Sequence, residues 1–137
     1  MSRLAAVCLV CAAFAAPPAL GQKSFFSDLN LPVNPVGQGQ FEVVEKRGAG
    51  PRDIWCAAAR FATENLGVQR GRIYVAAARG AAVSEVGRKG VTFTTRAPSK
   101  PVSTGVQITT RVVGASLPIN HAIQFCRDRI IEPSDRF

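Results

Sequence analysis

Two cysteines far apart in the chain, Cys56 and Cys126, constrain the fold more than any other feature. A lone cysteine pair in an oxidising compartment usually forms a disulfide. The bond would close a loop of about 70 residues, which the chain-entropy relation stabilises by about 4 kcal/mol. A redox-active or metal-binding pair is the alternative, but redox pairs are usually close in sequence and a structural zinc site needs about four ligands. We therefore predict a structural disulfide.

The prediction requires an oxidising compartment, and the N-terminus has the pattern of a secretory signal. A short positive region at Arg3 precedes an uncharged apolar run, Leu4–Ala16. The run is too short to cross a bilayer of about 30 Å. Pro17 and Pro18 then break the run. Small residues follow, and we predict the signal peptidase cleavage site after Gly21, with Ala15 as the alternative. A buried N-terminal helix of a cytosolic protein is the competing interpretation.

The other two cysteines fall inside this signal. A lipoprotein anchor needs a small residue directly before the cysteine, whereas Val7 precedes Cys8 and Val10 precedes Cys11. We therefore predict that residues 1–21 are discarded without a lipid anchor, and that the protein is periplasmic or secreted. No second apolar segment follows, so we predict no transmembrane segment.

The charge of the chain favours acidic partners. The formal net charge is +8, and cleavage of the signal would remove only Arg3 from it. Such an excess suits an acidic protein, an anionic polymer of the envelope, nucleic acid or a headgroup surface. The plainer interpretation is that the charge serves solubility.

The remaining length suits one domain with one modest core. Residues 22–40 contain Pro and Gly without a period and are interpreted as an extended lead-in. Residues 41–132 form the predicted domain, and residues 133–137 a short tail.

Alternating apolar and polar residues predict strands, and apolar residues at helical spacing predict helices. The predicted strands are residues 41–46, 72–77, 91–96 and 106–113. Helices are expected from Pro51 to about Leu66 and, with Ser116 as N-cap, from Pro118 to Pro133. The expected fold is α+β, with a four-stranded, mainly antiparallel sheet and two helices on one face, in the order β-α-β-β-β-α.

Each helix has an apolar stripe. In the first, the buried stripe is predicted to comprise Trp55, Ala58, Ala59, Ala62 and Leu66, with Cys56 at its edge. In the second, the stripe comprises Ile119, Ile123, Cys126 and Ile130. The predicted disulfide would thus join the two helices that cover the sheet.

The chain offers little for catalysis. His121, the single histidine, is predicted on the solvent side of the last helix, away from any nucleophile. The carboxylates are scattered among arginines that would lower their pKa, whereas a glycosidase needs one raised pKa. Glu42 and Glu45 are interpreted as solvent-side strand positions. Gly48–Gly50 resembles an anion cradle but is better explained as a turn. No metal site or cofactor is expected.

The sheet face opposite the helices is the predicted binding surface. On three predicted strands, alternate residues face away from the helices and onto this surface. From these residues we select Arg72, Tyr74, Arg96, Thr109 and Arg111. Guanidinium groups, hydroxyls and one phenol suit an acidic or hydroxyl-rich partner. Specific nucleic-acid recognition is not expected, because the interleaved aromatic residues of RNA-binding sheets are missing. An ordinary solvated face is the alternative.

Five segments carry a resemblance: FEVVEKRGAG, DIWCAAARFA, RIYVAAARG, VTFTTR and SLPINHAIQFC. Together, over residues 41–126, they are similar to a group of small, uncharacterised exported bacterial proteins with one cysteine at a helix start and another near the C-terminus. The resemblance implies export and the disulfide, and no activity.

Three functional hypotheses follow. The first is a non-enzymatic exported binding module for an acidic partner, acting through the sheet face. The second is a structural or accessory protein of the cell envelope that uses the lead-in and the helices as its contact. The third, an envelope hydrolase, has the least support.

Overall fold

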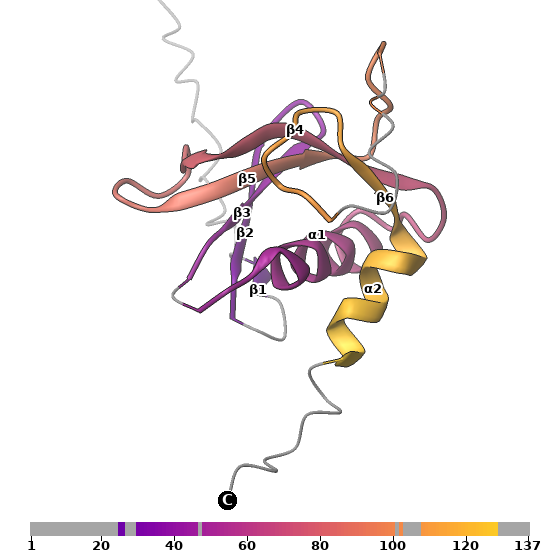
Figure 1. Cartoon of the computed structure of the whole chain (residues 1–137), viewed down its shortest axis with the longest axis horizontal. Helices are drawn as coiled ribbons and strands as arrows, with labels where there is room; N and C mark the ends of the chain where they lie inside the picture. Colours follow the sequence, from indigo (N-terminus) through magenta and orange to yellow (C-terminus); the bar gives the residue numbers. More distant parts are fainter. Residues whose placement is uncertain (1–24, 27–29, 47, 101, 103–107, 129–137) are drawn as a thin grey trace, which may run out of the picture.

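The computed structural model describes residues 25–26, 30–46, 48–100, 102 and 108–128. Within these residues the fold is α+β: a six-stranded antiparallel sheet with two helices on one side of it (Figure 1). The elements are β1 (Phe25–Phe26), β2 (Pro32–Gly37), β3 (Gln40–Val44), α1 (Pro51–Glu64), β4 (Arg72–Ala81), β5 (Lys89–Thr94), β6 (Ser116–Pro118) and α2 (Ile119–Asp128). The predicted class is confirmed; the predicted number of strands is too small.

The strands follow the spatial order β1-β2-β3-β5-β4-β6. Every neighbouring pair is antiparallel, with Phe41 opposite Phe93 and Ile73 opposite Leu117. The ladder between β4 and β5 contains register shifts on either side of Ala77. Such irregularities increase the local twist and bend a strand. They fall in the part of β4 that leads to the β4–β5 loop.

Helix α1 begins where the sequence favours a start. Pro51 occupies the first turn, and an Oδ of Asp53 accepts a hydrogen bond from the Gly50 N–H at 2.8 Å. A carboxylate there satisfies a backbone donor and complements the helix dipole. The helix ends at Glu64, and Gly67 follows with a φ of 67° that suits glycine.

The core lies between the sheet and α1. Trp55 packs edge-on against Phe93, with ring centroids 5.0 Å apart, and Phe41 lies 4.6 Å from Phe61. The small side chains of Ala57, Ala58, Ala59 and Ala62 in α1 are buried in the same core. All of these side chains are buried, whereas Leu66, predicted to be part of the stripe, lies beyond the helix and is 44% exposed.

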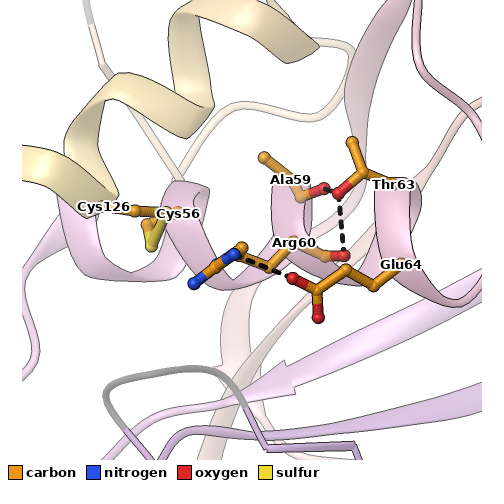
Figure 2. Close-up of polar contacts among 6 residues, drawn as sticks. All are labelled: Cys56, Ala59, Arg60, Thr63, Glu64 and Cys126. Atoms are coloured by element: carbon orange, nitrogen blue, oxygen red, sulfur yellow. Dashed lines mark hydrogen bonds and ion pairs between the residues drawn. A yellow bond between two sulfur atoms is a disulfide. The ribbon is translucent and has the colours of Figure 1, made fainter.

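The disulfide between Cys56 and Cys126 is confirmed, with 5.2 Å between the Cα atoms. It joins α1 to α2, as Figure 2 shows. The described stripe of α2 is centred on Ile119, Ala122 and Phe125, which are buried, while Ile123 and Cys126 are half-buried. Ile130 lies outside the described residues.

Two sequence predictions about strands are wrong. Residues 32–37, assigned to the lead-in, form β2 and pair with β3. Within the predicted strand 106–113, residues 106 and 107 lie outside the described part, and residues 108–113 form no strand. Ser116, predicted as a helix N-cap, lies instead in β6.

The second error has a local cause. The backbone from 110 to 115 meets β4 at two separate places. Arg79 N–H donates to the Thr110 carbonyl, and Val75 donates to the Ala115 carbonyl and accepts from the Gly114 N–H. Between these points the chain turns, with Gly114 at a φ of 87°. The alternating β-branched residues therefore do not enter a ladder, and Val112 is 41% exposed.

Candidate binding surface

Three of the predicted binding residues lie at one end of the sheet. Tyr74 of β4 is opposite Thr94 of β5, which is in turn opposite Gln40 of β3. Arg72 begins β4, and Arg96 lies two positions after Thr94, at the same end. This end also holds the β2–β3 turn. We call Arg70, Arg72 and Arg96, all exposed, the cationic end of the sheet.

Hydrogen bonds hold the side chain of Arg72 and the backbone of Arg96, two of the three arginines in the predicted set. The Arg72 guanidinium donates from Nε to Ser116 Oγ at 3.0 Å and from Nη2 to the Ser116 carbonyl at 3.3 Å. The backbone N–H of Arg96 donates to Thr94 Oγ1. The side chain of Arg96 lies against the β2–β3 turn, where a Cβ added to Gly39 would stand 3.5 Å from Nε.

The other two predicted residues lie elsewhere. Thr109 and Arg111 belong to the segment after the undescribed residues 103–107, where Thr109 Oγ1 accepts a hydrogen bond from the Arg111 N–H. The carbonyl of Thr110, between them, meets Arg79, which is five residues along β4 from Tyr74. At about 3.3 Å per strand residue, that is roughly 16 Å away. The predicted set thus divides into two groups.

The interpretation of Glu42 as a solvent-side strand position is wrong, because this residue is buried. Its side chain is 2% exposed, and the β4–β5 loop folds over it. Glu42 Oε2 accepts a hydrogen bond from the Val83 N–H at 2.8 Å, and Oε1 accepts from the N–H and hydroxyl of Ser84 at 2.9 and 2.6 Å. Asn34 of β2 donates to the same Ser84 hydroxyl. Thr92, opposite Glu42, is buried too.

Glu45 forms the other internal carboxylate contact of this region. Arg79 donates to both of its oxygens, from Nε at 2.6 Å and from Nη2 at 2.9 Å. This hydrogen bonding outweighs the desolvation of the carboxyl and lowers the pKa of Glu45 below its ordinary value, and the positive charges of Arg79, Lys89 and Arg111 act in the same direction. The forked geometry is the strong form of an arginine–carboxylate contact.

Every carboxylate whose side chain is described accepts a hydrogen bond or pairs with a cation. Besides Glu42, Glu45 and Asp53, Glu64 pairs with Arg60 (Figure 2) and Glu85 lies 3.8 Å from Arg88. Besides Arg88, the exposed cations of the same part of the chain are Arg52, Arg70, Arg72, Lys89, Arg96, Lys100, Arg111 and Arg127. The surface is therefore positive because its acids face inward or hold a cation of their own.

Sequence reasoning missed a pocket beside the cationic end. Its volume is about 260 Å³, and its lining is mostly apolar. It lies between the β2–β3 turn and the C-terminal end of α1, and is lined by Pro35, Gly37, Gln38, Gly39, Gln40, Phe41, Phe61 and Leu66. The available signal was the Gly37-Gln38-Gly39 sequence, which marks a turn, together with Leu66 just past a helix end.

His121 lies on α2 beside an aromatic ring. The imidazole is exposed on α2, as predicted, and contacts the ring of Phe125 at 5.4 Å. Among the described residues, no group of three or more His, Cys, Asp or Glu side chains could hold a metal ion. In the same part of the chain, no helix has the length and apolarity needed to cross a membrane.

Comparison with known proteins adds no relative: no family model, curated protein or solved structure matches the chain significantly.

Proposed function

We propose that the protein is an exported binding module, without catalytic activity, for an acidic partner: an acidic protein or an anionic polymer of the envelope. The observation that carries the proposal is that negative charges on the described surface are neutralised, whereas positive charges at the cationic end are not. The described carboxylates are buried or paired, while arginines at the cationic end point to no described acid. A partner would supply the missing negative charge.

Export is supported by two independent features. One is the charged, apolar and small-residue order of residues 1–21. The other is the bond between Cys56 and Cys126, because disulfides persist in oxidising compartments and are rare in the cytosol.

The proposal is tested by titrating the purified protein with labelled polyglutamate and, separately, with a labelled anionic polysaccharide over a salt series. We expect binding at low salt that weakens as salt rises, since exposed charges are screened. Changing Arg72→Gln and Arg96→Gln together should weaken the binding about tenfold at low salt.

A matched control removes the same charge from the helices, with Arg52→Gln and Arg127→Gln. Both positions are exposed, and Arg52 lies 5.6 Å from the centre of the Phe125 ring. Equal losses in the two double variants would show that net charge alone attracts the ligand, and would remove the cationic end from the proposal. Arg96→Gln alone leaves the Arg72–Ser116 contact intact. A loss of ligand binding in this single variant therefore does not come from a fold destabilised by the loss of that contact.

A further inference from the structure

The pocket at the cationic end has a mostly apolar lining, as expected of a site that binds an apolar group. Phe41 and Phe61 are among its lining residues but are only 1% and 2% exposed, so the apolar surface open to a ligand belongs to other residues of the lining. Leu66, 44% exposed, forms part of its wall. Apolar surface of this kind gains from being covered, and a concave shape lets one inserted group cover much of it.

The turn that borders the pocket is held in an unusual backbone conformation. Gly37 and Gly39 have φ angles of 117° and 73°, and Gln38 between them has a φ of 26°. A positive φ is readily adopted by glycine but is uncommon for glutamine, and such outliers concentrate at ligand-binding sites. This observation is independent of the cavity itself.

A guanidinium group stands at the edge of the pocket. Arg96 contacts the turn at Gly39, which is one of the lining residues. Arg70 and Arg72 lie at the same end of the sheet. An apolar group that enters here is therefore expected to carry negative charge beside it.

The size of the pocket indicates what enters. Sites for whole small molecules usually measure roughly 300–1,000 Å³, whereas this one measures about 260 Å³. It suits a single large side chain, the usual anchor of a protein–protein contact. A polysaccharide has no such apolar side chain.

We propose that the pocket takes one aromatic or leucine side chain of an acidic polypeptide, whose neighbouring carboxylates pair with Arg96 and the other cations of this end. The inference rests on the proposed function and narrows its partner to an acidic protein segment.

Two short synthetic peptides test it: one of glutamates around a central phenylalanine, and one with serine in place of the phenylalanine. We expect the purified protein to bind the phenylalanine peptide about tenfold more tightly, because only that peptide buries a large apolar side chain. Leu66→Ser should reduce its affinity to that of the serine peptide while leaving the serine peptide unchanged. Arg96→Gln should weaken both.

Val113→Ser is the matched control, because Val113 is 56% exposed and does not line the pocket. It should change the binding of neither peptide. Amide NMR signals of Gln38 and Gln40 should shift more with the phenylalanine peptide than with the serine peptide.

The outcomes separate the two proposals. Equal binding of both peptides would overturn the pocket inference and leave an acidic partner standing, as would binding of the anionic polysaccharide without either peptide. Binding of no anionic probe at low salt would overturn the proposed function itself.

Discussion

The carboxylate of Glu42 holds Ser84, a residue on the loop between β4 and β5, through both its backbone N–H and its hydroxyl. The Glu42 side chain is buried, and its hydrogen bonds to Ser84 hold the loop over the outer face of β3. One acid in a strand thereby determines where a loop forty-two residues later in the chain comes to rest.

Replacing Glu42 should destabilise the protein markedly. Glu42→Ala leaves the N–H groups of Val83 and Ser84 without their acceptor, which costs about 2 kcal/mol in the free energy of unfolding. Denaturant unfolding measures this loss, and hydrogen exchange at Val83 and Ser84 should accelerate. Glu64→Ala, on the exposed end of α1, is the control and should change stability little. Unchanged exchange at the two amides would contradict the assigned role of Glu42.

Gly90 is predicted to be intolerant of a side chain because of the same carboxylate. A Cβ at this position would stand 3.0 Å from Cγ and Cδ of Glu42. Gly90→Ala should therefore cost about 1–3 kcal/mol of stability, the usual range for overpacking. In combination with Glu42→Ala, which removes the obstructing atoms, the cost of the alanine should fall. A strictly additive double-mutant cycle would show that the two residues do not interact.

The disulfide should supply much of the stability. Replacing Cys56 and Cys126 together by alanine is expected to lower the free energy of unfolding by about 4 kcal/mol. Reduction of the native protein should produce a similar loss, and the double variant should then be insensitive to reductant. Persistent sensitivity of that variant would mean that the reductant acts elsewhere.

The pair between Glu45 and Arg79 should make stability depend on acid pH. The pKa of Glu45 in the folded protein is lowered from its ordinary value, so the paired carboxylate stabilises the fold at pH values above the pKa of the unfolded chain. This contribution is lost as the pH falls through the folded pKa. Glu45→Gln should therefore flatten the stability curve in this acidic window, and Arg79→Gln should do the same. An unchanged acid slope in both variants would refute the contribution.

The sequence predicted what depends on local pattern. The apolar spacing in α1 and the proline at its start placed that helix nearly correctly. The pairing of Cys56 with Cys126 followed from counting cysteines once those of the predicted signal were set aside.

What it missed depends on contacts between distant segments. Glu42 has the parity of a solvent-side residue, and only the return of the β4–β5 loop buries it. Likewise, Ile108 to Val113 alternate like a strand, but this segment touches β4 only at separate points and turns between them. The pocket combines a turn with a helix end that lies more than twenty residues later, and nothing local connects the two.

The position of the disulfide divides the chain into two kinds of backbone. Everything between Cys56 and Cys126, including β4, β5 and β6, lies inside a covalent ring. β2 and β3, which carry the turn of the pocket, precede Cys56 and are attached to the ring's strands through the ladder between β3 and β5. If the two ends of the oxidised protein were pulled apart, only residues outside the ring could lengthen the chain. The force would separate β3 from β5. The disulfide, rather than the backbone within the ring, would carry the tension between Cys56 and Cys126.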